Sequence, residues 1–384
     1  MTGTAAGGTG PVGVGIVGCG NIFPSYALGL AKLGSVRVTG CADIDQARAQ
    51  AMAKAHDLNA YASPGELMDD PEVGLVVNIT PPVVHGAVTR QALASGKHVF
   101  VEKPLAASLA DAGPVIAALA AAPGRLGCAP DTFLASAGQT ARAAIDAGVI
   151  GEPIGVAAAI PHSRAEEWHP DPTFLFRAGA GPLLDMGPYY VASLVNCLGP
   201  VASVSGATRI GKNPRPVTAP GRLVPSVSVQ VPTHAVAILR FASGVIGTLT
   251  ASFDIWSEHL PHIEIYGSEG ILRVPNPDLF AEDVTVKPNG SEEWRVLPPV
   301  LNLGDFLPGD QRIRGLGVAD LVDSLGGRPQ RTSAELGQHV LEVLESVEAS
   351  STSGAVVHLT TAPARPARVD AGDLAGLAVV PAQS

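Results

Sequence analysis

The sequence predicts a doubly wound α/β domain followed by an α+β domain. The first prediction rests on short apolar runs that alternate with helical stretches between Pro11 and Ala129. The second rests on a change of rhythm after Gly151, where strand-like runs follow one another between helices. A length of 384 residues lies above the usual range of one domain and favours two.

Five apolar runs of the first domain have the character of strands that are buried on both faces of a parallel sheet. They are Val12–Val17, Val36–Ala42, Leu75–Ile79, His98–Val101 and Leu126–Ala129. Helix starts lie between them: Ser63-Pro64-Gly65-Glu66 is a capping box, and Ser108-Leu109-Ala110-Asp111 is a weaker form of it. Such alternation predicts right-handed crossovers in an open sheet.

The second domain is predicted from strands bracketed by helices. Helices are expected near 183–198, 313–325 and 333–350, and strands at 201–210, 234–241, 245–253, 262–266 and 284–287. Ser243-Gly244 is a hairpin signal between two of these strands. The Pro-rich segment 211–232 is expected to form a loop, and the Ala- and Pro-rich tail after Thr361 to be partly disordered. The expected domains are 1–130 and 131–360, followed by a tail over 361–384.

Composition excludes several classes of protein. The chain carries 25 Lys and Arg against 35 Asp and Glu, a formal net charge of −10 without a basic tract. This balance disfavours nucleic acids and anionic membranes as partners. No apolar run approaches the roughly 20 residues that span a bilayer, and MTGTAAGGTG lacks the features of a signal peptide. Four cysteines without a CxxC pair indicate buried thiols in a reducing cytoplasm rather than a disulfide or zinc framework.

The first strand runs into Gly18-Cys19-Gly20-Asn21-Ile22-Phe23, two glycines of a GxGxxG turn with Phe23 in the third position. Gly18 permits the tight turn, and Gly20 lets a pyrophosphate approach the helix N-terminus. Asp43 ends the second strand about 20 residues later, as a dinucleotide site requires. Its carboxylate suits the ribose hydroxyls of NAD and repels a 2′-phosphate, a preference that Arg48 could soften. The alternative is a glycine turn that binds nothing.

Two further motifs follow strands directly. Thr80-Pro81-Pro82 follows the third apolar run, and Glu102-Lys103-Pro104 follows the fourth. Open α/β sheets bind ligands at these carboxyl ends. Burial or a neighbouring positive nicotinamide would lower the pKa of a lysine placed there. The alternative is a surface lysine paired with Glu102.

With these motifs the chain resembles the Gfo/Idh/MocA family of sugar and cyclitol dehydrogenases. The resemblance covers roughly 12–360 and lies in Gly18-Cys19-Gly20-Asn21-Ile22, Cys41-Ala42-Asp43, Thr80-Pro81-Pro82 with His85, Gly96-Lys97-His98-Val99-Phe100-Val101-Glu102-Lys103-Pro104, Gly181-Pro182-Leu183-Leu184-Asp185-Met186-Gly187-Pro188-Tyr189 and Ile263-Glu264-Ile265-Tyr266-Gly267-Ser268-Glu269-Gly270.

The resemblance implies an NAD-binding Rossmann domain and a second domain with a large open, mostly antiparallel sheet that commonly mediates homodimers or homotetramers. Hydride would pass between a carbinol carbon and nicotinamide, without a metal. Lys103 would orient the substrate hydroxyl and the nicotinamide, and Asp185 would pair with the substrate or with the base. The resemblance also carries a cofactor role to Thr80, Pro81, His85 and Glu102.

The chain departs from the family pattern at Tyr189, where the family commonly has a histidine as general acid/base. Asp185 and Tyr189 have the spacing of one helix face, although Pro188 indicates that the helix begins only there. A tyrosine base needs an adjacent cation, such as Lys103, to act near neutral pH. Tyr189 as an aromatic wall, with Lys103 or a nearby histidine as the base, is the alternative.

Three other residues are candidates for substrate binding. In the stretch 161–170, Trp168 could stack on a sugar face and His169 could carry a proton, unless the stretch is a surface loop with an anchored tryptophan. Asp131 follows the last strand of the first domain, where it could contact substrate or cap a helix. The pair His259 and His262 lacks the spacing and the partners of a metal site.

The prediction from all of these features is a cytoplasmic, NAD-dependent dehydrogenase of a sugar, glycoside or inositol. A glycosidase that uses NAD transiently, through oxidation, elimination, hydration and re-reduction, is the main alternative. A third possibility, a nicotinamide-binding sensor without catalysis, is disfavoured because sensing needs neither Lys103 nor Asp185.

Overall fold

A computed structural model describes residues 10–256, 259–303, 313–370, 373–374 and 380–381. The chain forms two compact units. The first unit comprises 1–134, 302–337 and 369–381, and the second comprises 135–301, 338–368 and 382–384. Each unit therefore draws on separate stretches of chain, whereas the sequence suggested contiguous domains.

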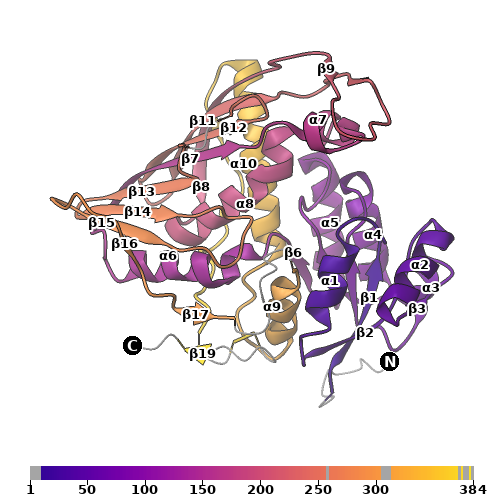
Figure 1. The fold of residues 1–384 in the computed structure, drawn as a ribbon. Helices are drawn as coiled ribbons and strands as arrows, with labels where there is room; N and C mark the ends of the chain where they lie inside the picture. The colour runs from indigo at the N-terminus through magenta and orange to yellow at the C-terminus, as the bar shows by residue number, and fades with distance from the viewer. Residues whose placement is uncertain (1–9, 257–258, 304–312, 371–372, 375–379, 382–384) are drawn as a thin grey trace. The chain divides into compact units, whose positions relative to one another are not determined.

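The first unit contains a six-stranded parallel sheet in the order β3-β2-β1-β4-β5-β6 (Figure 1). Its strands are β1 Val12–Val17, β2 Val36–Ala42, β3 Asn59–Ala60, β4 Leu75–Asn78, β5 His98–Val101 and β6 Leu126–Cys128. Its helices are α1 Phe23–Leu30, α2 Gln46–His56, α3 Pro64–Asp69, α4 Pro82–Ala94, α5 Leu109–Ala121 and α9 Leu316–Leu325. The strand order reverses between β1 and β4, and ligands of such sheets bind at that switch point. The doubly wound fold is confirmed.

Local sequence explains these elements. The Ser63 hydroxyl accepts the Glu66 N–H at 3.1 Å and starts α3, and the Ser108 hydroxyl accepts the Asp111 N–H at 3.2 Å and starts α5. Both predicted caps are confirmed. The central strands are buried on both faces, as continuous apolar runs require.

The second unit contains a nine-stranded sheet in the order β16-β15-β14-β13-β7-β12-β11-β8-β18, antiparallel except where β12 pairs with β7. Its strands are β7 Pro153–Pro161, β8 Val201–Arg209, β11 His234–Phe241, β12 Ile246–Ser252, β13 Ile263–Gly267, β14 Gly270–Val274, β15 Thr285–Pro288, β16 Arg295–Val296 and β18 Val357–His358. The large, mostly antiparallel sheet is confirmed.

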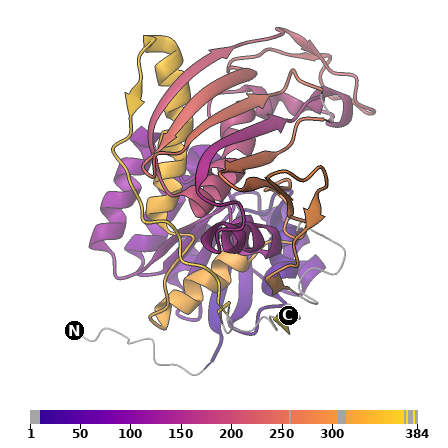
Figure 2. The same cartoon turned by 90° about the vertical axis from the view of Figure 1, so that its left-hand side faces the viewer.

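Helices cover one face of this sheet (Figure 2). They are α6 Ser136–Asp146, α8 Gly181–Leu198 and the part of α10 Ala334–Ser353 that belongs to the second unit. On β11, Ala235, Ala237 and Leu239 are buried, whereas Val236 and Ile238 between them are 40% and 42% exposed. Within the described residues, no helix covers the second face.

The remaining elements are short. They are the 3-10 helices Thr132–Leu134 and Pro172–Phe176, α7 Ala165–Trp168, β9 Arg215–Pro216, β10 Ser226–Val227, β17 Leu301–Asn302 and β19 Val380–Pro381. No helix of the described chain is long and apolar enough to cross a membrane. All four cysteines are buried and unpaired, which confirms the prediction of free thiols.

One local expectation was wrong and another was incomplete. Helix α8 begins at Gly181 and contains Pro188, rather than beginning there. Its first turn already holds Pro182, and burial of most of its residues stabilises the helix despite the internal proline. The segment 211–232 includes the paired strands β9 and β10, because it builds a small core of its own. That core contains Val217, Ala219, Val227 and Val229 together with Phe176 and Phe253.

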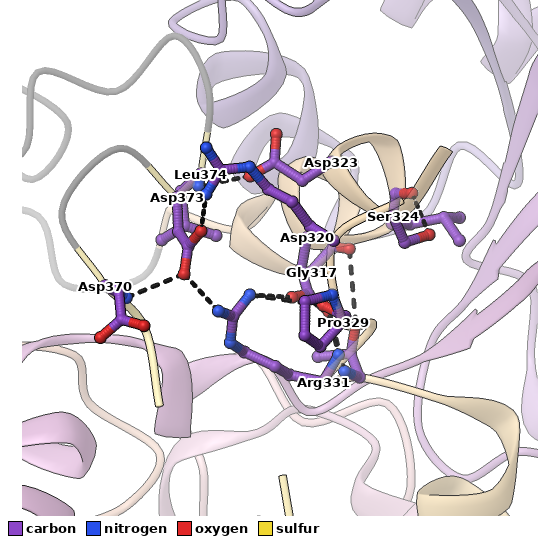
Figure 3. Close-up of polar contacts among 12 residues, drawn as sticks. Gly317, Asp320, Asp323, Ser324, Pro329, Arg331, Asp370, Asp373 and Leu374 are labelled. Carbon is purple, nitrogen blue, oxygen red and sulfur yellow. Dashed lines mark hydrogen bonds and ion pairs between the residues drawn. The ribbon is translucent and has the colours of Figure 1, made fainter. Parts of the chain in front are cut away.

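Part of the tail after Thr361 is bound to the first unit by ion pairs (Figure 3), and the expectation of partial disorder for the rest falls partly on residues outside the described ones. The Arg331 guanidinium, 2% exposed, lies 3.0 Å from the Asp320 carboxylate and also pairs with Asp373 of the tail. Asp323 of α9 accepts the N–H of Leu374 at 2.5 Å. Buried charges need such partners, so these contacts fix the tail against α9.

Candidate active site

The glycine turn after β1 is open to a ligand. Gly18 has φ +102°, and a Cβ there would lie 2.9 Å from the Ile79 backbone, so only glycine fits. A Cβ at Gly20 would meet nothing within 4 Å. The N–H groups of Gly20, Asn21 and Ile22 donate to no acceptor in the part of the chain that the structure describes. Open N–H groups at a helix N-terminus suit a pyrophosphate.

Phe23 explains the missing third glycine. Its side chain is fully buried and meets the His56 ring edge-on, with the ring centroids 5.5 Å apart. The third glycine of the motif normally allows close packing of helix and strand. Here an aromatic side chain fills that interface instead, and the first two glycines keep the turn that a dinucleotide needs.

Asp43 lies beside this turn, at the end of β2. Its carboxylate accepts the Cys19 N–H at 2.7 Å and the Asp45 N–H at 2.8 Å. Each oxygen keeps a further lone pair, which suits the ribose hydroxyls of a dinucleotide. The Arg48 guanidinium lies 3.6 Å from the Asp45 carboxylate, so its charge is directed to a neighbouring acid. These residues fit NAD.

The loop after β4 is organised by a buried amide. Asn78, fully buried, accepts the Thr80 hydroxyl at 2.6 Å and donates to the His85 carbonyl oxygen at 3.1 Å. His85 itself is 1% exposed. Its Nε2 lies 2.6 Å from the Thr80 carbonyl oxygen, and its Nδ1 lies 2.7 Å from the Pro104 carbonyl oxygen. Burial lowers the pKa of His85, while the two carbonyls and Glu102 oppose that shift.

The loop after β5 carries Lys103, which is half-buried. The Glu102 carboxylate, 6% exposed, accepts the Lys103 backbone N–H at 2.8 Å and the Tyr26 hydroxyl at 2.9 Å. Burial raises the pKa of Tyr26, and the nearby Glu102 charge raises it further. Tyr26 is therefore the protonated donor that fixes Glu102 beneath the loop.

Asp131 is 1% exposed and lies at the start of α9. One carboxylate oxygen accepts the N–H of Gly317 at 2.9 Å and the N–H of Gly315 at 3.3 Å. Burial raises the pKa of Asp131, opposed by the Arg314 charge. Asp131 therefore caps the first turn of α9 from a distant part of the chain, rather than capping a helix that it starts itself. A contact of Asp131 with substrate stays a prediction.

Helix α8 carries Asp185 and Tyr189 four residues apart, on one helix face. Asp185 is half-buried and Tyr189 is 6% exposed. The next residue, Tyr190, is 1% exposed, and its hydroxyl lies 2.5 Å from His262 Nδ1. Burial raises the pKa of Tyr190 and lowers that of His262, so the phenol donates to a neutral imidazole.

Trp168 and His169 form an aromatic cluster with Phe174. The His169 ring meets Trp168 and Phe174 edge-on, with centroids 5.6 and 5.1 Å away. Trp168 is 56% and Phe174 54% exposed. His169 Nδ1 accepts the Asp171 N–H at 3.1 Å, so neutral His169 carries its proton on Nε2.

A cluster of buried ion pairs anchors the chain segment that carries this aromatic cluster. Arg215, 4% exposed, pairs with Glu166 at 2.7 Å and also with Asp254, and its guanidinium lies 5.2 Å from the Phe176 ring centroid. Glu166 belongs to the same short helix, α7, as Trp168. The large exposed rings therefore stand on an anchored segment, unlike those of a loose surface loop.

The structure groups the predicted residues by unit. The cofactor candidates gather at the carboxyl ends of β1, β2, β4 and β5 in the first unit, and Asp185, Tyr189, Trp168 and His169 lie in the second. Sequence reasoning missed Tyr26, Asn78, Arg215 and Tyr190. Asn78 alone gave a signal, a polar residue inside an apolar strand run. Among the described residues, no three His, Cys, Asp or Glu side chains form a group that could hold a metal.

Comparisons with known proteins agree with this architecture. Residues 12–129 match a family model described as an oxidoreductase family with an NAD-binding Rossmann fold. Residues 139–273 match the model of the GFO/IDH/MocA C-terminal domain. Together the two matches cover well over half of the chain.

Individual relatives are distant. An inositol 2-dehydrogenase of Ralstonia nicotianae is 35% identical over 145 residues, which are 37% of this chain and 43% of that enzyme. A trans-1,2-dihydrobenzene-1,2-diol dehydrogenase of Bos taurus is 28% identical over 293 residues, 74% of this chain and 80% of that enzyme. The structure of levoglucosan dehydrogenase with NADH and levoglucosan has a TM-score of 0.77 at 19% identity, over 91% of this chain and 100% of that one. At that identity the likeness concerns the fold.

Proposed function

The chain belongs to the Gfo/Idh/MocA family of oxidoreductases and contains its NAD-binding Rossmann domain, and we propose that it oxidises a carbinol carbon of a sugar, glycoside or inositol. The observation that carries the proposal is the placement of Lys103. Its backbone is fixed by Glu102 at the carboxyl end of β5, in the sheet that also carries the glycine turn. A lysine whose backbone is fixed at the ligand-binding edge of the sheet suits the role of orienting a substrate hydroxyl.

Bound NAD supplies the hydride acceptor. Lys103 holds the substrate hydroxyl, and Asp185 with either Tyr189 or His169 takes up its proton. His169 can take up a proton only at Nδ1, after Nδ1 releases the Asp171 N–H that it accepts, because Nε2 of the neutral ring already carries a proton. Tyr189 supports this role through its position one helical turn after Asp185.

Trp168 is proposed to bind one face of the substrate ring. Trp168→Ala is expected to raise KM about fivefold with kcat nearly unchanged, since aromatic contacts are worth about 1 kcal/mol. Steady-state kinetics on the best substrate measures this. Trp294→Ala is the control. The Arg273 guanidinium lies 3.9 Å from the centroid of the Trp294 ring, in the β14–β16 part of the sheet. Equal effects of both variants would contradict the binding role.

Asp43 is proposed to select NAD over NADP. Asp43→Asn keeps an oxygen for the Cys19 N–H but removes the charge that repels a 2′-phosphate. We expect NAD binding to weaken about 10- to 100-fold, because a hydrogen bond to a charged group is worth about 1.5–3 kcal/mol, and NADP binding to become measurable. Fluorescence titration with both cofactors tests this, with Asp45→Asn as the control. An unchanged preference would remove Asp43 from the cofactor site.

We also propose that the chain works in the cytoplasm as a homodimer or homotetramer. Four reduced, buried cysteines support the location. The uncovered face of the nine-stranded sheet supports self-association, since Val236, Ile238 and Ile246 are 40–49% exposed there. Analytical ultracentrifugation gives the subunit number directly.

A paired assay tests the reaction. A panel of sugars, inositols and aryl glycosides is incubated with NAD, and NADH and released aglycone are recorded in the same wells. Growth of NADH with turnover is expected. Release of aglycone over many turnovers without NADH would replace the dehydrogenase by the NAD-dependent glycosidase, and no signal in either channel would contradict the proposed substrate class.

A further inference from the structure

The two loops proposed to meet the nicotinamide are short of backbone donors. Pro81 and Pro82 follow β4, and Pro104 follows Lys103, so three residues have no N–H. One backbone hydrogen bond, from the Glu102 N–H to the Asn78 carbonyl oxygen at 2.9 Å, joins the ends of the two strands. Beyond it, the carbonyl oxygens of Thr80 and Pro104 lie beside a side-chain donor.

His85 supplies this donor. Its two ring nitrogens lie 2.6 and 2.7 Å from the carbonyl oxygens of Thr80 and Pro104, one in each loop. The two N–H directions of an imidazole diverge widely, so one ring can bridge acceptors on opposite sides. A neutral ring donates to one carbonyl and an imidazolium to both. At 1% exposure, and with both nitrogens on protein oxygens, the ring has no edge left for a cofactor.

Hydrogen bonds on both sides of Lys103 restrain its backbone. Its N–H is held by the Glu102 carboxylate at 2.8 Å, and the carbonyl of the next residue is held by His85. His85 is in turn fixed through its own carbonyl oxygen, which accepts from Asn78 at 3.1 Å. The backbone of Lys103 is therefore restrained from both directions by buried side chains.

We infer that His85 is a positioning residue that ties the loop after β4 to the loop after β5 and so sets the place of the Lys103 amine. The inference rests on the proposed role of Lys103. It assigns His85 a function that does not require contact with NAD, unlike the cofactor role expected from the sequence.

The test uses the full chain and two variants in which His85 is replaced by a side chain of similar volume. His85→Leu removes both ring nitrogens from the two carbonyl oxygens, and His85→Gln restores one amide donor. His98→Gln is the matched control, because His98 stands at the opposite end of β5 and accepts the Arg125 N–H at 3.0 Å. NAD affinity, kcat and thermal unfolding are measured for each protein.

We expect His85→Leu to lower kcat about 100-fold, the usual cost of a misplaced catalytic group, with NAD affinity nearly unchanged. His85→Gln should recover part of that loss, and His98→Gln should match wild type. Combined with Lys103→Ala, His85→Leu should cost little more, because residues that act through one group are not additive. Additive losses would overturn the inference.

A second readout does not use turnover. The Lys103 amine of the apo-protein is acetylated with limiting acetic anhydride, and mass spectrometry measures the labelled fraction. This fraction should change severalfold in His85→Leu and stay unchanged in His98→Gln. Equal labelling in all proteins would overturn the positioning role, even if His85→Leu is inactive for other reasons. Retained turnover in Lys103→Ala would instead overturn the proposed function of the lysine.

Discussion

Replacing Lys103 by alanine is expected to lower turnover by about 100- to 10,000-fold, the range that a positioned proton-transfer group contributes, while NAD still binds. The reason is local. The glycine turn and Asp43 make their contacts without the Lys103 side chain. Stopped-flow kinetics for hydride transfer and a fluorescence titration with NAD separate the two effects.

Lys97→Ala is the control for this experiment. Lys97 precedes β5, donates to the Asp70 carbonyl oxygen at 2.9 Å, and lies at the opposite end of the strand from Lys103. It should retain full turnover. Lys103→Arg keeps the positive charge but not the position of the amine, so it should resemble alanine in rate. Near wild-type rates in Lys103→Ala would remove the lysine from the chemistry.

Replacing Arg331 by methionine is expected to destabilise the first unit by about 3–5 kcal/mol, the cost of leaving a buried charge without its partner. Asp320 is fully buried and Asp373 is 4% exposed, so water cannot replace the lost guanidinium. Urea unfolding followed by circular dichroism measures the change. Arg37→Met should cost less than about 1 kcal/mol, because the Arg37 and Glu72 side chains are 54% and 67% exposed. Similar losses in both variants would contradict the argument.

The same network predicts a pH dependence. Burial raises the pKa of Asp373, but the Asp370 N–H and the Arg331 and Arg328 guanidinium groups outweigh it and hold that pKa below its usual range. A carboxylate whose pKa is lowered in the folded state stabilises the fold at neutral pH. This contribution to the free energy of unfolding is lost as the pH falls through the lowered pKa. Asp373→Asn should therefore flatten the acid limb of a plot of unfolding midpoint against pH.

Much of the fold could be predicted because its signals are local. Apolar runs bounded by caps identified β1, β2 and β5 to the residue, and the capping serines identified the starts of α3 and α5. The edge strands and the β9–β10 pair were missed because two-residue strands carry no periodicity. The longer strands β7 and β14 are also absent from the predicted strands.

The candidate site was predictable only where a motif marks it. Gly18, Asp43 and Lys103 lie in such motifs, whereas Tyr26 and Arg215 do not, because their roles come from partners 76 and 49 residues away. Pro188 was misread because its local preference for a first helical turn is overridden by the packing of α8. The untested roles of Tyr189 and His169 depend on a substrate, which a sequence does not contain.

The ion pairs between α9 and the tail also set an order of events during synthesis. Residues 10–134 are synthesised before Arg331, and Arg331 is synthesised before its tail partner Asp373. About 240 residues separate position 134 from Asp373, and until Asp373 is made the buried Arg331 charge lacks one of its two carboxylate partners. Ribosome-bound chains that stop before residue 373 should therefore hold the first unit in a form that proteases still cut.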